Sequence, residues 1–309
     1  MRRRFAVPLI LICAFLPWYA LMPKVPDVSF PAVESAVIDF RHDADWFGGI
    51  SGLEVFGGGA QYLAVTDRGH LFGGSLARKE GRLITVTVDN QRSVIADDMT
   101  EFEFPHGDAE GLAAAPDRRL HVSYEHAHRV QSFGTWEDDP VWTGYAPSWN
   151  ALSKNGGLEA LAVDNEGTIF AIPERVASGA WAALVYRYGD DGQWQQPFTL
   201  PVDSGFSPVG ADFGPDGRLY ILERGLYPFG FFSRVRSMQV TPDGVEDTRV
   251  ELHTPFRKYG NLEGIAVWQD ENDKLRLTMV SDDNFQWFLP SQIVEYVIDP
   301  ALANRARAD

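Results

Sequence analysis

Short apolar runs of four to six residues recur along the chain, separated by turns rich in Gly, Pro, Asp and Asn. Clear examples are residues 120–124, 169–172 and 219–222, where β-branched or aromatic side chains alternate with others. Such runs are typical of β-strands, and the segments between them are typical of hairpin turns. No long stretch after residue 35 repeats its apolar residues at helical spacing. The pattern therefore predicts an all-β protein.

One strand pattern recurs five times, and each copy opens with an acidic or small residue beside Gly or Ala. The copies lie at Ser51, Glu110, Glu159, Asp212 and Glu263. Their spacing of roughly 50 residues is the length that four short strands and their turns need, so each copy predicts one blade of a single β-propeller.

The number of blades and the closure of the ring follow from the same pattern. We count five blades and leave six open, since a divergent blade could lie within residues 70–107. A propeller must close its ring to bury both faces of every blade. The N-terminal strand at residues 33–40 is expected to close it by completing the last blade beside residues 292–298.

A second acid follows most openings by about one strand and one turn. These second acids are Asp67, Glu125, Glu174, Glu223 and the pair Asp282–Asp283. The strand before each of them runs back toward the face where the repeat opens, so both sets of acids are expected at one mouth of the central channel. Facing carboxylates are unfavourable unless cations, arginines or shared protons compensate them.

Two kinds of compensation are consistent with the sequence. In the first, a hard cation such as Ca²⁺, which takes six to eight oxygen ligands, binds at the mouth. The predicted metal ligands are then Glu110, Glu159, Asp212, Glu263, Asp282 and Asp283, and the predicted substrate-binding residues are Arg68, Arg175, Arg224 and Arg234. In the second, Glu and Arg pair between blades and only hold the ring together. We leave both open.

The catalytic residues are not assigned by the sequence. His106, His126 and His128 lie near the acids of the second repeat and are candidates for a general base, although a histidine on a β-loop is more often a surface residue. Ser51 lacks the Gly-x-Ser-x-Gly context of a serine nucleophile, so we reject that role.

Four further acids are expected to shape turns only. Asp117, Asp164, Asp216 and Asp243 stand in Pro-Asp or Asp-Gly hairpin contexts. There Asp hydrogen-bonds its own backbone.

Charge and cysteine content narrow the classes of function. The net charge is −16 at pH 7, which argues against nucleic-acid binding because phosphates need a positive field. The only cysteine is Cys13, so the rest of the chain has no disulfide, zinc–thiolate site or cysteine nucleophile.

The N-terminal segment has the pattern of an export signal or membrane anchor. Arg2, Arg3 and Arg4 precede an uncharged apolar run over residues 5–22. We therefore expect residues 1–26 to be a signal peptide or an anchor. The protein is then periplasmic or exported, anchored or not to the inner membrane, and touches a membrane only through this segment. Residues 27–34 are expected to be a linker, and residues 301–309 a C-terminal tail. The oligomeric state is left open.

The repeats resemble those of the phytase-like propeller family, described as "esterase-like activity of phytase". The similar motifs are Gly49-Ile-Ser-Gly-Leu53 with Thr66-Asp-Arg-Gly69, Asp108-Ala-Glu-Gly-Leu-Ala113, Gly157-Leu-Glu-Ala-Leu-Ala162, Gly214-Pro-Asp-Gly-Arg-Leu-Tyr-Ile-Leu-Glu-Arg224, Asn261-Leu-Glu-Gly-Ile-Ala266 and Ser281-Asp-Asp-Asn-Phe285. The resemblance covers residues 35–300, which we take as the phytase-like propeller.

The resemblance implies hydrolysis of phosphoesters or esters, and calcium phytases bind Ca²⁺ in an acidic mouth. None of their individual ligands can be placed on this chain. The function that we predict is calcium-dependent hydrolysis of a small-molecule phosphoester, or of an ester, at the acidic mouth of the ring. The alternatives are a non-catalytic propeller that binds a ligand or partner and, less favoured, a calcium-dependent lactonase or carboxylesterase.

Overall fold

The computed structural model describes residues 28–94, 108–134, 136–175, 182–189, 191–201 and 205–298, together with Val25. The predicted signal or anchor at residues 1–26, apart from Val25, and the tail at residues 301–309 lie outside the described residues, as does His106. No helix among the described residues is long and apolar enough to cross a membrane.

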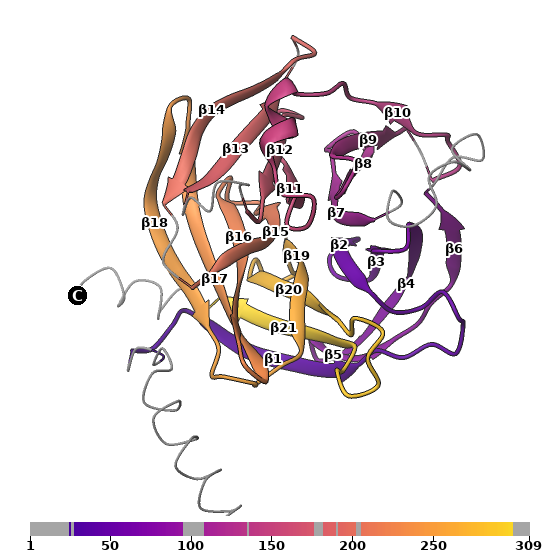
Figure 1. The fold of residues 1–309 in the computed structure, drawn as a ribbon. Coiled ribbons are helices and arrows are strands. Elements are labelled where there is room, and N and C mark those ends of the chain that lie inside the picture. The colour runs from indigo at the N-terminus through magenta and orange to yellow at the C-terminus, as the bar shows by residue number, and fades with distance from the viewer. Residues whose placement is uncertain are drawn as a thin grey trace, which may run out of the picture.

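Five antiparallel sheets stand around a central axis as the blades of a propeller (Figure 1). Blade 1 contains β2 (Ile50–Phe56), β3 (Gln61–Thr66), β4 (His70–Lys79), β5 (Arg82–Val86) and β6 (Asn90–Ser93), which pairs with β4. Blade 2 contains β7 (Ala109–Ala114), β8 (Leu120–Tyr124), β9 (Arg129–Phe133) and β10 (Val141–Trp142). Blade 3 contains β11 (Leu158–Val163), β12 (Ile169–Pro173), β13 (Ala182–Tyr188) and β14 (Trp194–Pro201). Blade 4 contains β15 (Ser207–Phe213), β16 (Leu219–Tyr227), β17 (Gly230–Thr241) and β18 (Gly244–His253).

Blade 5 joins the two ends of the described chain. It contains β19 (Asn261–Gln269), β20 (Leu275–Asp282), β21 (Gln292–Ile298) and, as its outer strand, β1 (Ala32–Asp39), which pairs antiparallel with β21. The predicted closure by an N-terminal strand is therefore confirmed. The described part of residues 70–107 forms the outer strands of blade 1, so the described residues form five blades and no sixth. The one helix among the described residues is a 3₁₀ turn at Pro147–Ala151.

The hydrophobic core is divided among the blade interfaces. Five clusters of buried side chains lie between adjacent blades, and one of them bridges blades 5 and 1 through Val280 and Leu53. A buried ion pair crosses the same interface, since Arg78 of β4 donates to Glu295 of β21 at 2.7 and 2.8 Å. Each blade thus buries its faces only against its neighbours, as the repeat predicts.

The inner strands approach one another closely at the axis, which explains the Gly or Ala in each repeat. Equivalent places in the five inner strands are occupied by Gly52, Gly111, Ala160, Gly210 and Gly264. A Cβ at Gly52 would lie 2.6 Å from the backbone nitrogen of Leu112, and one at Gly210 would lie 2.2 Å from the backbone oxygen of Glu263. These glycines are needed because the next blade's backbone occupies the space of a side chain.

Gly210→Ala is therefore expected to push β15 away from β19 and to lower the free energy of unfolding by about 2–3 kcal/mol, as overpacking does. Chemical denaturation measures this change. Gly244→Ala is the matched control, because no atom lies within 4 Å of its added Cβ and its φ is not positive. A Gly210→Ala variant as stable as the Gly244→Ala variant would contradict the close approach.

Three of the predicted turn acids shape hairpins. The Oδ1 atom of Asp117 accepts from the backbone nitrogen of Arg119 at 3.1 Å, and that of Asp164 accepts from Glu166 and Thr168 at 2.9 Å each. Asp216 accepts from Arg218 in the same way at 3.3 Å. Their structural role is confirmed.

Candidate functional site

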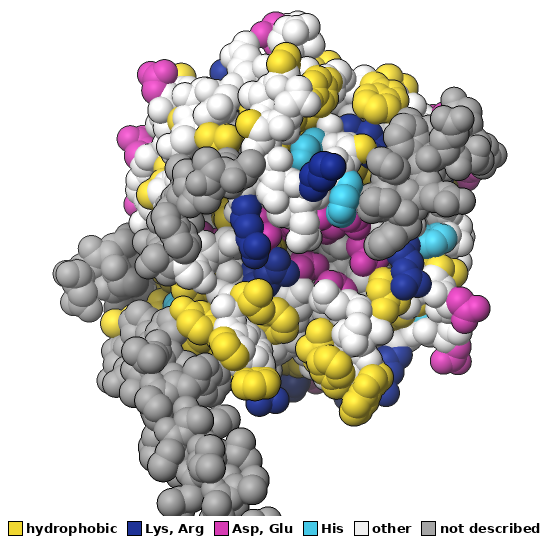
Figure 2. All heavy atoms as spheres, in the orientation of Figure 1, with side chains coloured by type: hydrophobic (Ala, Val, Ile, Leu, Met, Phe, Trp, Pro, Cys, Tyr) yellow, Lys and Arg dark blue, Asp and Glu magenta, His cyan; other side chains and the backbone are white. Residues whose placement is uncertain are grey.

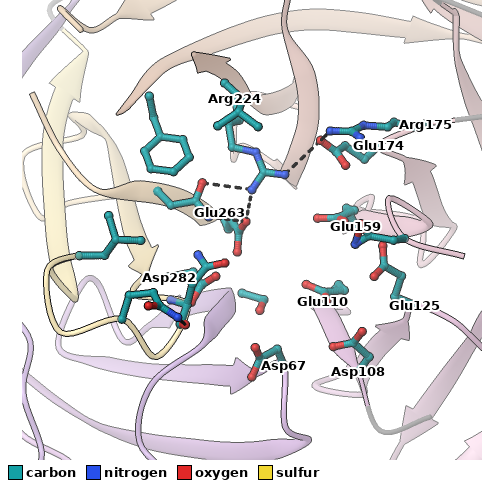
Figure 3. Close-up of a pocket in the computed structure, with 18 residues that line it drawn as sticks. Asp67, Asp108, Glu110, Glu125, Glu159, Glu174, Arg175, Arg224, Glu263 and Asp282 are labelled. Carbon is teal, nitrogen blue, oxygen red and sulfur yellow. Dashed lines mark hydrogen bonds and ion pairs between the residues drawn. The ribbon is translucent and has the colours of Figure 1, made fainter. Parts of the chain in front are cut away.

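A polar cavity of about 640 Å³ opens at one end of the propeller axis. Figure 2 shows carboxylate side chains at the bottom of this central hollow and basic side chains around it. Figure 3 shows acids from several blades pointing into the same space. Its charged lining residues are Asp67, Asp108, Glu110, Glu125, Glu159, Glu174, Glu263, Asp282, Arg175 and Arg224.

A β-bulge interrupts each inner strand, and in four of the five blades it turns one side chain into the cavity. The pairing between the inner strand and the second strand of each blade shifts its register once. The extra residues, from blade 1 to blade 5, are Ser51, Glu110, Glu159, Val209 and Glu263. A bulge inserts one residue and redirects its side chain. Ser51 and the three glutamates line the cavity, whereas Val209 is buried in the core between blades 4 and 5.

The second strand of each blade supplies the other set of charged groups. In each blade, one residue of the second strand pairs with the inner-strand residue that precedes the bulge. The next residue of the second strand is an acid in blades 1, 2, 3 and 5, and these equivalent acids are Asp67, Glu125, Glu174 and Asp282. In blade 4 the equivalent residue, paired with Ser207, is Arg224. The mouth thus carries acids from four blades and a guanidinium from the fifth.

Arg224 compensates part of this charge by bridging blades. Its Nη2 atom lies 3.0 Å from Glu174 Oε1, and its Nη1 atom donates to Asn261 Oδ1 at 3.1 Å and also to Glu263 (Figure 3). Arg175 lies 3.4 Å from Glu174 and is half-exposed. Eight carboxyl groups thus face two guanidinium groups in one cavity.

Burial, and then the charge of neighbouring groups, raises the pKa values of several of these carboxyl groups. Burial first, and then the charge of Asp108, raises the pKa of Asp67 to about 7. Burial and Glu125 raise the pKa of Asp108 to about 6, and burial and Glu263 raise that of Asp282 to about 9. The pKa of Glu110 also rises well above its ordinary value, through burial and the charge of Glu159.

Glu159 and Glu263 behave in the same way. Burial is the main cause that raises the pKa of both groups. The charge of Glu174 raises the pKa of Glu159 further, whereas the charge of Arg224 opposes the rise at Glu263. Near neutral pH the cavity must therefore hold protons or cations.

Four of the six predicted metal ligands meet in this cavity. They are Glu110, Glu159, Glu263 and Asp282, and two of the predicted substrate-binding arginines, Arg175 and Arg224, line it with them. The prediction that acids and arginines from several repeats converge at one mouth is confirmed for these residues.

The predicted place of Asp212 at the mouth is wrong. It lies three residues beyond the bulge of its strand, and its Oδ2 atom accepts from the backbone nitrogen of Val267 in the next blade at 2.5 Å. Glu54 is three residues beyond its own bulge and likewise accepts from Ala114 at 2.8 Å. Both acids link neighbouring blades away from the cavity.

Asp283 is also held in a structural role. Its Oδ1 atom accepts from the backbone nitrogens of Gly49 at 3.1 Å and Phe285 at 3.0 Å, and its Oδ2 atom accepts from Ser291 at 2.8 Å. Because side chains alternate along a strand end, Asp282 faces the cavity and Asp283 faces the neighbouring blade. Asp283 does not line the cavity.

Two predicted arginines lie outside the cavity lining. Arg234 is buried within blade 4, where its Nε atom lies 2.7 Å from Glu223 Oε2. Arg236 binds the same carboxylate at 2.6 Å, so Glu223 faces the blade and is not equivalent to Glu174. Arg68 is exposed and stacks on the ring of Phe285, with its guanidinium carbon 3.3 Å from the ring centroid.

Asp108 is the acid that sequence reasoning missed altogether. It lies two residues before the bulge of blade 2, where the other blades have Gly, Ser or Asn, so no repeat marked it. Asp67, Glu125 and Glu174 were expected at the mouth as repeated acids but were not among the predicted metal ligands, and all three line the cavity. Their recurrence one strand after each opening was the available signal.

The described residues fit a cation. Asp67 Oδ1 is buried and has no hydrogen-bond partner among the described residues. One ligand atom each from Asp108, Glu125 and His126 lie within 4.8 Å of one another, and His126 Nδ1 is 2.9 Å from Asp108 Oδ2. Carboxylate oxygens are the ligands that Ca²⁺ prefers, and the histidine adds a nitrogen that suits Zn²⁺.

Fold and cavity together define a five-bladed propeller with an acidic site at the axis. The phytase-like family, described as "Esterase-like activity of phytase", matches residues 45–285, and the chain belongs to this family. A comparison with curated proteins gives no match.

Several solved structures are similar to the chain at low identity. The aldose sugar dehydrogenase of Streptomyces coelicolor, in its PQQ-bound form, is 14% identical over 87% of this chain and 99% of that one, with a TM-score of 0.46. A gluconolactonase of Xanthomonas campestris is 16% identical over 91% and 90%, also at 0.46. Virginiamycin B lyase of Staphylococcus aureus is 10% identical over 85% and 98%, at 0.45. Likenesses of this degree say nothing of what the chain binds.

Proposed function

We propose that the acidic cavity binds a hard divalent cation, Ca²⁺ above all, and that the protein hydrolyses a small phosphoester or ester there. The observation that carries the proposal is the excess of eight carboxyl groups over two guanidinium groups in one cavity. Such an excess is costly unless protons or cations neutralise it. The family description supports hydrolysis as the reaction class.

The residues that would hold the cation are Glu110 and Glu159, with Asp67, Asp108 and Asp282 beside them. Asn155, Asn261 and Asn284 add amide groups to the lining. When bound, a divalent cation polarises a phosphoryl or carbonyl oxygen and lowers the pKa of bound water.

The chain's own polar groups would orient the substrate. Arg175 lines the cavity with its side chain 55% exposed, so it can donate two hydrogen bonds to a phosphate that enters from solvent. Asp108 lies against His126 and would orient the imidazole for proton transfer. A phosphate dianion can enter this cavity only when cations have lowered its negative charge.

A structural role for part of the ring is supported by other contacts. Glu223 pairs with Arg234 and Arg236 inside blade 4, and Arg224 bridges blades 3 and 5. In the alternative of a non-catalytic propeller, these pairs would be the purpose of the repeated Glu and Arg. Among the described residues, only Glu174 and Glu263 of the eight cavity acids pair with an arginine, which favours the first proposal.

The cellular location is part of the proposal. The basic and apolar pattern of residues 2–22 supports export to the envelope, with or without retention in the inner membrane. Fractionation of cells that express the full chain, combined with protease treatment of spheroplasts, tests it. Protection of the chain from protease in intact spheroplasts would contradict this location.

A metal panel combined with a substrate screen tests the function. We expect Ca²⁺ to raise the melting temperature and to support turnover of an aryl phosphate or an aryl ester, whereas Mg²⁺ and Zn²⁺ do so less. EDTA should abolish both effects. The ratio of phosphate to ester turnover decides the reaction class. Turnover with no metal response, or a metal response with no turnover of either substrate, would overturn the proposal in part.

Amide variants locate the cation. Glu110→Gln and Glu159→Gln are each expected to weaken Ca²⁺ binding at least about tenfold, the loss that follows removal of one charged ligand. Asp212→Asn and Asp283→Asn serve as controls and should change Ca²⁺ affinity by less than twofold, because both acids lie outside the cavity lining. Isothermal titration calorimetry measures all four. Equal losses in the controls would place the cation elsewhere.

A further inference from the structure

An apolar groove of about 520 Å³ lies directly beside the acidic cavity. We define the apolar groove by Leu226, Phe229, Phe231, Phe288, Leu289 and Pro290. Three residues, Leu226, Phe231 and Leu289, line both spaces, so the groove and the cavity are continuous. Figure 2 shows apolar side chains gathered on one side of the mouth.

The rim of the groove exposes large apolar side chains from two blades. Phe229 is 79% exposed and Leu226 is 60% exposed, both at the β16–β17 hairpin of blade 4. Phe288 is 62% exposed and Trp287 beside it is 94% exposed, in the loop between β20 and β21 of blade 5. Large exposed apolar groups that gather around one groove indicate a binding surface.

The position of Phe229 has no local explanation. Tyr227 pairs with Gly230, so Pro228 and Phe229 form a two-residue hairpin turn, and Phe229 has φ +72°. Gly or Asn adopts this conformation readily, whereas a bulky residue does so at a cost. Because the backbone conformation favours a small residue at this position, we infer that the aromatic side chain itself is needed there.

Two of the polar side chains that line the groove, Lys258 and Tyr259, are engaged within the protein. Lys258 Nζ lies 2.8 Å from Glu34 Oε2, and the hydroxyl of Tyr259 contacts both Glu34 and the hydroxyl of Tyr296. Arg257 lays its aliphatic stem against Gly230. The groove therefore offers mainly apolar surface, whereas the adjoining cavity, apart from the shared wall, offers mainly polar and charged groups for a head group.

We propose that the apolar groove is a second subsite of the acidic cavity, and that it receives the hydrocarbon part of an amphiphilic phosphoester whose charged head lies in the cavity. This inference rests on the proposed function. The shared wall allows one small molecule to contact both surfaces at once, with its polar end at Arg175 and the acids and its apolar end at Phe229 and Phe231.

Isothermal titration calorimetry with methyl phosphate and octyl phosphate tests the inference. The full-length protein is titrated in the presence of Ca²⁺, and octyl phosphate is kept below its aggregation threshold. We expect octyl phosphate to bind on the order of 50-fold more tightly, the gain from burying about three methylene groups at about fourfold each. Phe229→Ser and Phe288→Ser, which remove apolar lining of the groove, should each lower this preference severalfold and leave methyl phosphate binding unchanged.

Val141→Ser is the matched control, since Val141 is also exposed, at 65%, but lies on the outer strand of blade 2. Differential scanning fluorimetry confirms that every variant is folded. If methyl phosphate binds and octyl phosphate binds no more tightly, the groove proposal is wrong and the proposed function stands. If neither phosphate binds with Ca²⁺, the groove proposal and the phosphoester form of the proposed function are both overturned.

Two further results would assign the groove to another partner. In the first, the protein binds phosphatidylcholine or phosphatidylglycerol vesicles, loses this binding in Trp287→Ser, and shows no preference for octyl phosphate. The groove would then be a membrane-binding surface. A dimer in sedimentation experiments that dissociates in Phe229→Ser would make it an interface between copies of the chain. Either result overturns the proposal.

Discussion

Without divalent cations, the protein is expected to lose thermal stability as the pH rises from about 5 to about 9. The pKa values of Asp108, Asp67 and Asp282 are raised to about 6, 7 and 9, mainly by burial and then by neighbouring acids. Between the unfolded and the folded pKa, the folded protein binds more protons than the unfolded one. Raising the pH therefore favours unfolding.

The size of the effect follows from linkage. One carboxyl group contributes about 1.4 kcal/mol per unit of pKa shift, and because the groups interact, they release their protons in shared steps. We expect a loss on the order of 3 kcal/mol between pH 5 and pH 8, or about 6 °C in melting temperature for a chain of this size. Differential scanning fluorimetry over this range in EDTA measures it.

Calcium is expected to reverse the loss at pH 8 and to do little at pH 5, because its carboxylate ligands must be deprotonated. At 100 times the Kd, a ligand that binds only the folded state adds about 2.7 kcal/mol, or about 5 °C. The Glu110→Gln/Glu159→Gln double variant should flatten the pH profile. The Glu246→Gln/Glu271→Gln double variant removes two exposed acids and should not. A profile that is already flat in the unmodified protein would contradict protonated acids in the cavity.

Replacing Arg224 with Met is expected to destabilise the cation-free protein by about 3–5 kcal/mol at pH 8, the range for breaking a buried ion pair. Among the described residues, Arg224 is the basic group that bridges Glu174 and Glu263, and its side chain is only 15% exposed. Its loss leaves both acids without this partner. Burial and the charge of Glu174 already raise the pKa of Glu159, and without Arg224 the charges of Glu174 and Glu263 raise it further. Melting temperatures in EDTA measure the effect.

The same variant separates a structural from a metal-binding role of the mouth. Because Arg224→Met removes a positive charge from the cavity, Ca²⁺ should bind the variant more tightly and recover most of the lost stability. Arg175→Met is the control, since Arg175 is 55% exposed and its pair with Glu174 contributes little. A loss of stability that Ca²⁺ does not recover would indicate that the mouth only holds the blades together.

The propeller itself was predictable from local signals. Strand length, turn residues such as Asp164 and Asp216, and a period near 50 residues indicate repeated four-stranded sheets, and each of these is a property of neighbouring residues. The closing strand was predictable too, because the last repeat lacks one strand and residues 33–40 supply it. The β1–β21 pairing confirms this.

The membership of the site was only partly predictable. The recurring glutamates Glu110, Glu159 and Glu263 mark the bulge of their blades, and the structure brings them to one cavity. In blade 4 the bulge residue is Val209, which is not an acid. The repeat pattern therefore indicated Asp212, which lies three residues beyond the bulge. A repeat that has lost its acid cannot be aligned by its acids.

The amino-acid sequence was enough to predict the all-β fold, the repeat, and the acidic character of one mouth. Which charged residues share the cavity depends on how the strands pair in the folded protein: Asp282 lines it but Asp283 does not, and Arg224 lines it where Glu223 was expected. The reason is the two-residue period of a strand, in which a shift of one position moves a side chain from the channel to the neighbouring blade. A β-bulge makes that shift in every inner strand, and its position depends on strand pairing rather than on the local sequence.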